Sequence, residues 1–320
     1  MSIRSLLKKN EKLYTLLSNK KQSYRFKKAL DTKYTFEDRN NGSKELCIIL
    51  AGYKQFLYDE VFGRIAAYIP KNIDVCIISS GIYSNELSHI AKKNNWSYLS
   101  TKINCVTIAQ NVAISIFDKA EYIYKLDEDI FVTKGYFEKI KETYEYVNTY
   151  GEYTVGFVAP LIPINGYGHY KILEKLDLLE YYNNHFEHPR YEAGPHRMIE
   201  NSATVAKFMW GEGNIVPSID EMNDMFMKEK LSYSSCGIRF SIGAIYFSKQ
   251  TWKDMGMFKP AKGTALGLDE LQLCEYCISF SKAIIVSENT VVGHLSFGRQ
   301  NAEMKDYYLS NIKVKSNITN

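Results

Sequence analysis

The stretch Ala120–Thr133, AEYIYKLDEDIFVT, holds the pattern that decides the fold. Its first part, Tyr122–Leu126, is apolar and aromatic and predicts a short buried strand. Asp127, Glu128 and Asp129 follow at once. Because side chains alternate between the two faces of an extended chain, the two aspartates point one way and the glutamate points the other. The sequence therefore predicts a pair of carboxylates at the carboxyl end of a buried strand.

Two adjacent carboxylates repel each other unless a cation neutralises them. Carboxylate oxygens suit Mg²⁺ or Mn²⁺, and these ions commonly keep positions open for substrate phosphates. The carboxyl ends of strands are also where open α/β sheets bind ligands. An acidic turn that only makes a strand end soluble remains an alternative at this point.

Composition limits the classes of protein that fit. The 320 residues are 45% hydrophobic, enough for a large core, and 40 basic against 36 acidic residues predict no nucleic-acid partner. No apolar run is long enough to cross a bilayer, and no leader pattern opens the chain. Most of the six cysteines lie in apolar runs, which is typical of reduced, buried thiols. We expect a cytoplasmic protein, either free or peripheral at the inner face of the membrane.

Residues 1–30 differ in charge from the rest of the chain. They carry nine Lys or Arg against Glu11 alone, a local charge of +8. Apolar residues recur there at helical spacing and predict a basic amphipathic helix: Ile3, Leu6, Leu7, Leu13, Tyr14 and Leu17. This helix either contacts an anionic membrane surface or packs on the main domain or on a second copy in a homo-oligomer. We divide the chain into a helical extension (1–43), a main domain (44–305) and a C-terminal tail (306–320).

From Glu45 onward, strand and helix patterns alternate. Strands are predicted at 46–50, 74–79 and 96–100, and helices at 58–69, at 85–93 with Asn85 as its cap, and at 109–117. This order is typical of an α/β protein with a mostly parallel sheet flanked by helices. Neither GxGxxG after the first strand nor GxxxxGK[ST] occurs, which disfavours a dinucleotide dehydrogenase and a P-loop NTPase.

Later motifs extend the pattern. Gln110-Asn111 lies in the helix before the acidic strand, and Phe240–Phe258 (FSIGAIYFSKQTWKDMGMF) precedes Gly267–Leu271 (GLDEL) and Val292–His294 (VGH). In this order, over roughly residues 45–300, the chain resembles the GT-A-fold nucleotide-sugar glycosyltransferases, especially the inverting family 2-like group. The resemblance implies a Rossmann-like, mostly parallel sheet flanked by helices, here with the N-terminal helical extension.

The resemblance also implies a metal site built on the DxD motif. Asp129 would bind Mn²⁺ or Mg²⁺ directly, Asp127 would touch the ribose or the metal through water, and His294 would be a further ligand. An ordinary histidine near a strand end remains the alternative for His294. Across the cavity Asp269 would be the general base, and it would also serve as a helix N-cap. Leu268 replaces the acidic residue usual before the base, so Asp269 and Glu270 both remain candidates.

The nucleotide side matches the family less well. Ser79-Ser80 stands where an Asp is common, and Gln110 replaces the usual Arg. The backbone at Ala51–Tyr53 is expected to hold the base, with Tyr53 stacking on it or simply packed in the core. Trp210 either stacks on a sugar or anchors its loop, and Arg299 either approaches a diphosphate or lies in solvent. The residues expected on this side are Ala51, Gly52, Tyr53, Ser80, Gln110, Asn111, Asp127 and Arg299.

The sequence thus predicts a metal-dependent, inverting glycosyltransferase of hexosyltransferase type. The expected donor is a nucleotide sugar, a UDP-sugar, and the expected acceptor is a hydroxyl of a glycan, lipid-linked glycan or surface polysaccharide. Two alternatives remain. A sugar nucleotidyltransferase would carry a Gly-rich basic loop after the first strand, of which AGYKQ is a poor version. A non-catalytic nucleotide- or glycan-binding module is favoured if Asp269 lies far from Asp129.

Overall fold

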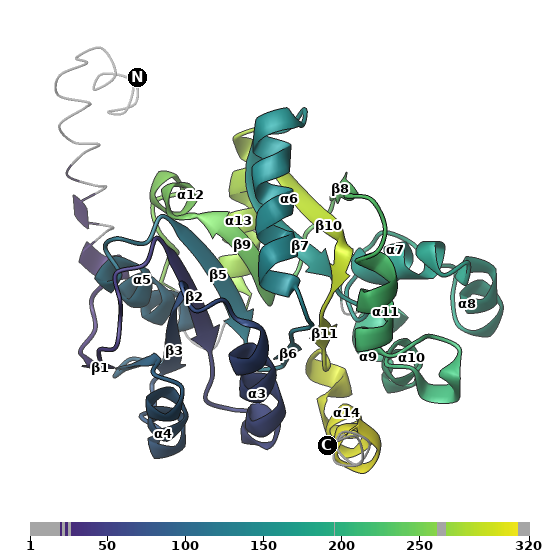
Figure 1. Cartoon of the computed structure of the whole chain (residues 1–320), viewed down its shortest axis with the longest axis horizontal. Coiled ribbons are helices and arrows are strands. Elements are labelled where there is room, and N and C mark those ends of the chain that lie inside the picture. Colours follow the sequence, from purple (N-terminus) through teal and green to yellow (C-terminus); the bar gives the residue numbers. More distant parts are fainter. Residues whose placement is uncertain (1–19, 21–22, 25–26, 195, 261–266, 313–320) are drawn as a thin grey trace, which may run out of the picture.

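A single large sheet organises the part of the chain that the computed structural model describes, which is residues 20, 23, 24, 27–194, 196–260 and 267–312 (Figure 1). The predicted amphipathic stripe Ile3–Leu17 lies outside these residues. Within them the sheet has nine strands in the order β1-β4-β3-β2-β5-β9-β7-β10-β8. The strands are β1 (Tyr34–Glu37), β2 (Glu45–Leu50), β3 (Asp74–Ser80), β4 (Ser97–Thr101), β5 (Tyr122–Asp127), β7 (Val155–Leu161), β8 (Tyr233–Ser235), β9 (Ala244–Ser248) and β10 (Ala283–Val291).

The prediction of a mostly parallel α/β sheet is confirmed. β4, β3, β2 and β5 are mutually parallel, and β7 and β10 are parallel to each other. β9 runs antiparallel between β5 and β7, so these six strands share one direction, while β1 and β8 are antiparallel at the two edges. β1 comes from the segment predicted as a helical extension, and it adds an edge strand to the sheet.

Helices cover both faces of the sheet. In Figure 1, α6 crosses in front of β7 and β10 while α13 lies behind them, and α7 to α11 form a group beside β8 and β10. The α-helices are α3 (Tyr58–Tyr68), α4 (Asn85–Lys93), α5 (Val106–Ile116), α6 (Tyr136–Tyr150), α7 (Gly168–Lys175), α8 (Leu179–His185), α9 (Met198–Asn201), α10 (Ala203–Met209), α11 (Ile219–Phe226), α12 (Lys249–Asp254), α13 (Leu268–Ser279) and α14 (Asn301–Tyr307). Short 3₁₀ turns η1 (Gln55–Leu57), η2 (Glu212–Asn214) and η3 (Gly298–Gln300) and a π-helical turn η4 (Tyr308–Ile312) complete the set.

The strand order reverses at one position. From β2 the chain moves outward through β3 to β4 and then returns to β5 on the other side of β2. The order therefore reverses between β2 and β5, whose ends are paired at Leu50 and Asp127. Open α/β sheets bind ligands at the carboxyl ends of strands where the order reverses. Residues 51–54 and the acidic triplet leave the sheet side by side at this point.

A second, two-stranded sheet joins distant parts of the chain. β6 (Ile130–Phe131) pairs antiparallel with β11 (Gly293–His294), with His294 opposite Ile130. This pairing places His294 next to the end of the acidic triplet. Beyond it, Tyr308 of the predicted C-terminal tail is buried against Phe56 and Phe131, so the packed structure continues past residue 305.

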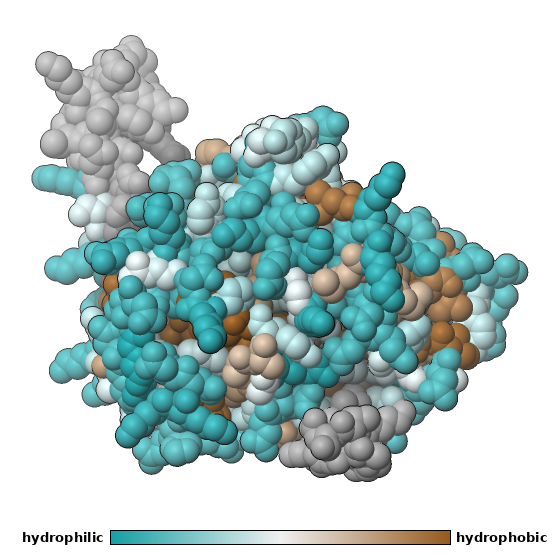
Figure 2. Space-filling view, in the orientation of Figure 1, coloured by the Kyte–Doolittle hydropathy of each residue, from teal (hydrophilic) through white to brown (hydrophobic). Residues whose placement is uncertain are grey.

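The surface and the cysteines agree with the composition. The face in Figure 2 is mainly hydrophilic, with separate apolar patches. None of the described helices combines the length and the apolar character needed to span a membrane. All six cysteines are buried, as predicted: Cys47, Cys76, Cys105, Cys236, Cys274 and Cys277.

The cap of α4 differs by one residue from the prediction. Ser84, not Asn85, has extended backbone angles, and its hydroxyl accepts a hydrogen bond from the Leu87 amide at 3.2 Å. Asn85 is the first helical residue. The prediction failed because both residue types cap helices well and only the backbone conformation distinguishes them.

Replacing Ser84 with Ala should lower the free energy of unfolding by about 1 kcal/mol, because the Leu87 amide loses its acceptor. Asn85→Ala is the matched control and should change it by less than about 0.5 kcal/mol. Urea unfolding of both variants measures the difference. A larger loss in Asn85→Ala than in Ser84→Ala would contradict the assignment.

Candidate active site

Each member of the acidic triplet faces a different partner. Glu128 turns away from the two aspartates, as strand alternation predicts, and accepts hydrogen bonds from the Gly52 amide at 2.8 Å and the Tyr53 amide at 3.1 Å. Asp129 is almost fully buried, with 6% of its side chain exposed, while Asp127 is 37% exposed. The carboxylate pair thus lies at the reversal point of the sheet, and Glu128 shapes the loop beside it.

Two lysines neutralise the aspartates. Lys125 donates to Asp127 Oδ1 at 2.6 Å and to the Ile242 carbonyl at 2.8 Å. Lys54 donates to Asp129 Oδ2 at 2.5 Å. Sequence reasoning missed both contacts. Lys125 did leave a signal, because a lysine inside a buried strand needs a partner and lies on the same face as the residue two positions later.

His294 approaches the same oxygen of Asp129. Its Nε2 lies 3.2 Å from Asp129 Oδ2. Burial by itself raises the pKa of Asp129, but His294 and Lys54 outweigh burial and hold that pKa well below its usual value. Asp129 is therefore ionised at neutral pH.

Trp210 fixes the backbone of His294. Its indole N–H donates to the His294 carbonyl at 3.1 Å, and its ring packs on Phe131. A Cβ added at Gly293 would lie 2.6 Å from the Trp210 ring, so glycine is needed for this close approach. Trp210 was predicted either to stack on a sugar or to anchor its loop, and these contacts support the anchoring role.

The donor set at Asp129 and His294 suits a hard divalent ion. No group of three His, Cys, Asp or Glu side chains that could hold a metal ion occurs in the described residues, so Asp129 and His294 would need further ligands from outside the protein. Adjacent ligands of an octahedral ion with bonds of about 2.1 Å lie about 3 Å apart, and Asp129 Oδ2 and His294 Nε2 are 3.2 Å apart. Water and substrate phosphates would supply the remaining ligands.

Asp269 is a buried carboxylate on α13. It is in the first turn of α13, is 9% exposed, and accepts a hydrogen bond from Gln110 Nε2 at 2.8 Å. Burial raises the pKa of Asp127, Lys125 opposes this, and the charges of Asp129 and Asp269 raise it further. The charge of Asp269 thus acts on that of Asp127. The predicted N-cap role is wrong, because Gly267, with φ of 75°, occupies the cap position.

Glu270 faces a different partner from Asp269. Its carboxylate accepts a hydrogen bond from Arg239 Nε, and the Arg239 side chain is 54% exposed. Burial raises the pKa of Glu270, and Arg239 opposes that effect. Of the two candidate carboxylates, Glu270 is bound to an arginine and Asp269 to a neutral amide.

The backbone amides of Ala51–Tyr53, the loop expected to hold the nucleobase, already donate hydrogen bonds within the protein. The Gly52 and Tyr53 amides donate to Glu128, and the Ala51 amide donates to the Ile78 carbonyl at 2.9 Å. The Tyr53 ring is 65% exposed, and its hydroxyl donates to the Ser80 carbonyl at 3.2 Å. Tyr53 is therefore not packed in the core, and its ring and the loop carbonyls are what this segment offers a ligand.

Three other residues predicted on the nucleotide side make contacts within the protein. Asn111 uses its whole side chain within the protein, donating to the Ala29 and Phe258 carbonyls and accepting from Trp252 Nε1. The Ser80 hydroxyl accepts from the Cys105 amide at 2.6 Å and supports the start of α5. Gln110 contacts Asp269, the candidate general base, and not the loop of residues 51–53.

Arg299 is not placed by any contact. It lies in η3, five residues beyond His294, and its side chain is exposed. No hydrogen bond or ion pair of Arg299 occurs with the described residues. Its predicted approach to a diphosphate stays a prediction.

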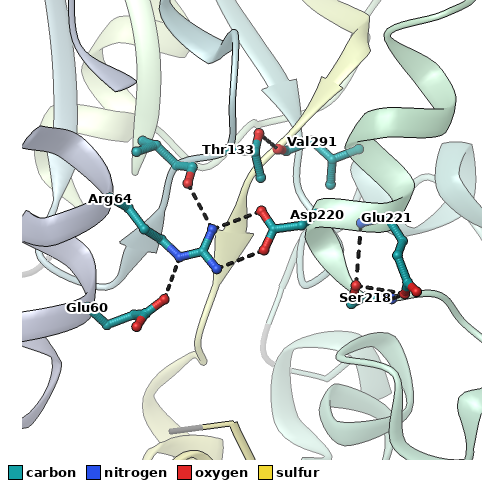
Figure 3. A network of polar contacts seen from close by, with 8 residues as sticks. Glu60, Arg64, Thr133, Ser218, Asp220, Glu221 and Val291 are labelled. Carbon is teal, nitrogen blue, oxygen red and sulfur yellow. Dashed lines mark hydrogen bonds and ion pairs between the residues drawn. The ribbon is translucent and has the colours of Figure 1, made fainter. Parts of the chain in front are cut away.

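An arginine clamp supports the metal side of the site (Figure 3). Arg64 of α3 binds Asp220 of α11 through two hydrogen bonds of 2.8 and 2.9 Å and Glu60 at 2.6 Å. It also donates to the Val132 carbonyl at 3.3 Å, just beyond β6. Nearby, the Thr133 hydroxyl donates to the Val291 carbonyl at 2.5 Å. These contacts tie α3, α11 and the ends of β6 and β10 together around the strand pair that carries His294.

Replacing Arg64 with Met should lower the free energy of unfolding by about 2 kcal/mol, because Glu60 and Asp220 lose a bidentate partner. The matched control is Lys139→Met, which removes a surface pair with Glu142 of 2.7 Å and should cost about 0.5 kcal/mol or less. Chemical denaturation of both variants measures the difference. Equal losses would show that the clamp adds no more than a surface ion pair.

Together, fold and site define an α/β protein with Asp127, Asp129 and His294 at the position where the strand order of its sheet reverses. No protein-family model and no curated protein matches the sequence. Solved structures of glycosyltransferases are similar in fold. One is the mannosyltransferase PcManGT from Pyrobaculum calidifontis in complex with GDP-Man and Mn²⁺, with a TM-score of 0.48, 11% identity, and coverage of 92% of this chain and 70% of that chain.

A second similar structure is TarS residues 1–349 from S. aureus in complex with UDP-GlcNAc. It has a TM-score of 0.46 and 12% identity, and the match covers 82% of this chain and 60% of that chain. The chain thus spans about three fifths of that TarS structure. At these identities the likeness concerns the fold alone, and the roles of residues have to be argued from the site itself.

Proposed function

We propose that this chain is a metal-dependent, inverting glycosyltransferase that moves a hexose from a nucleotide-sugar donor, a UDP-sugar, to a hydroxyl of a glycan or lipid-linked glycan. One observation carries the proposal. Asp129 and His294 are in contact where the sheet order reverses, and the charge of the buried Asp269 acts on the neighbouring Asp127. This supports a cation-binding carboxylate and a separate buried carboxylate in one site, as transfer from a diphosphate requires.

On the donor side, Asp129 and His294 would hold Mn²⁺ or Mg²⁺. When bound, the ion would stabilise the negative charge on the leaving nucleoside diphosphate. The lowered pKa of Asp129 keeps this ligand ionised at neutral pH. Lys125 fixes Asp127 from a buried position, so Asp127 presents its free oxygen toward the donor. The exposed Tyr53 ring offers a stacking surface for the base.

On the acceptor side, Asp269 is the general base. The Gln110 amide holds one of its oxygens and leaves the other to take a proton from the acceptor hydroxyl. Glu270 is a poorer candidate, because its carboxylate is bound to a charged partner, Arg239, whereas the partner of Asp269 is a neutral amide. Attack from the side of Asp269, opposite the diphosphate, inverts the anomeric centre. Gln110 is a positioning residue in this scheme.

The two alternative functions fit the site less well. A sugar nucleotidyltransferase would bind phosphates with the amides of the loop after the first strand, and here Glu128 occupies the Gly52 and Tyr53 amides. A binding module without catalysis has no need of a base near the metal pair, and the charge of Asp269 is felt at Asp127.

Asp129→Asn should weaken the Mn²⁺-dependent part of nucleoside diphosphate binding by about tenfold or more, because the ion loses its charged ligand. Calorimetric titrations of UDP and of GDP, each with and without Mn²⁺, measure this part. Asp118→Asn, a surface substitution away from the site, is the control and should bind as the unchanged protein does. Binding that is indifferent to Mn²⁺ in all three proteins would contradict the metal site.

Asp269→Asn should lower kcat by about 10²- to 10⁴-fold while donor binding changes by less than about twofold, because only proton removal is lost. Glu270→Gln is the matched variant and should keep kcat within about tenfold. A panel of nucleotide sugars is first screened for slow hydrolysis, which identifies the donor. The rate at which each variant turns over this donor is then measured. A large loss in Glu270→Gln with near-normal Asp269→Asn would move the base to Glu270.

A further inference from the structure

Asp129 Oδ2 already has two partners in the folded chain. Lys54 Nζ lies 2.5 Å from it and His294 Nε2 lies 3.2 Å from it. A carboxylate has about four lone-pair positions over two oxygens, so two partners fill those of one oxygen. An ion bound to both Asp129 Oδ2 and His294 Nε2 would replace the contact between these two atoms and would lie next to the Lys54 ammonium, which repels it while it stays on the same oxygen.

Lys54 is suited to move, and Lys125 is not. Lys54 lies on the loop between β2 and η1, its side chain is 24% exposed, and Asp129 is its one hydrogen-bond partner among the described residues. Lys125 has 2% of its side chain exposed and is held by both Asp127 and the Ile242 carbonyl. Lysine is a compact charge on a flexible stem, and it binds phosphate oxygens as a point charge.

Lys54 lies where the diphosphate of the proposed donor could become its second partner. The loop that carries it leaves β2 at the position where the sheet order reverses, next to the end of β5. Under the proposed function a diphosphate lies at this position, within reach of a lysine that already contacts the metal ligand. A lysine released from Asp129 would thus pair with the diphosphate rather than enter solvent.

We propose that Lys54 holds the cation position on Asp129 in the donor-free protein and passes to the donor diphosphate when a divalent ion takes that position. The inference rests on the proposed function and adds a coupling to it. A divalent ion alone must either bind beside the Lys54 ammonium, which repels it, or displace this ammonium from Asp129, and in both cases it binds weakly. A nucleoside diphosphate offers Lys54 a new partner, so the nucleotide and the ion favour each other's binding.

The test measures Mn²⁺ binding by the loss of the free-ion electron paramagnetic resonance signal, without nucleotide and with saturating UDP or GDP. Lys54→Met should bind Mn²⁺ without nucleotide about fivefold or more tightly than the unchanged protein, and the gain caused by the nucleotide should shrink by a similar factor. Lys54→Gln is a second variant with the same expected result.

Two controls separate the role of the Lys54 charge from general effects. Lys54→Arg keeps a cation beside Asp129 and should bind Mn²⁺ weakly without nucleotide. Lys141→Met is the second control. Lys141 lies away from the site, and its Nζ is 3.0 Å from another buried carboxylate, Glu45, so this substitution should leave Mn²⁺ binding unchanged.

The outcomes distinguish this inference from the function on which it rests. Nucleotide-dependent Mn²⁺ binding in the unchanged protein, with equal nucleotide-free affinity in Lys54→Met and Lys54→Gln, would overturn the exchange of Lys54 and leave the proposed function standing. Absence of Mn²⁺ binding in every protein, with and without either nucleotide, would overturn both.

Discussion

The neutralisation of Asp129 is the interaction on which the site depends. A carboxylate with 6% of its side chain exposed is costly to bury unless its charge is compensated. Lys54 and His294 provide that compensation from the loop after β2 and from β11. Because the three residues come from separate parts of the chain, this cluster also links the β2–β5 half of the sheet with the β6–β11 strand pair. The contacts of Lys54 and His294 with Asp129 therefore stabilise this part of the fold and also fix the carboxylate of the proposed metal site.

The remaining contacts hold that arrangement in place. Trp210 fixes the His294 carbonyl, Gly293 allows its ring to come close, and Arg64 joins α3 to α11 beside β6. None of these residues needs to touch a ligand. They restrict the position of His294, which the two-residue strand β11 alone would hold weakly. A precise donor set on a short strand requires such support.

Much of the fold was predictable because its signals are local. β2, β3, β4 and β5 begin and end within about one residue of the predicted strands, and Glu128 turns away from the aspartates as alternation requires. The partners of polar groups were not predictable, because they depend on which distant segments meet. Asn111 was expected on the nucleotide and is instead saturated by the 252–258 turn, and Lys54 gave no signal in the sequence. Motif order predicted that Asp269 and His294 belong to one site. The pairing of β11 with β6 explains how His294 reaches Asp129, and the place of Asp269 in that site stays a prediction.

The acidic triplet shows why the spacing of the two aspartates matters. β5 ends at Asp127, and Glu128 and Asp129 form the turn that joins it to β6. There Glu128 binds the Gly52 and Tyr53 amides, and this sets the course of the loop that carries Lys54. A Gln at position 128 would have one acceptor oxygen in place of two, because its other terminal atom is an NH2 group that only donates. The middle residue of the motif is therefore structural, and it positions the lysine that neutralises the last one.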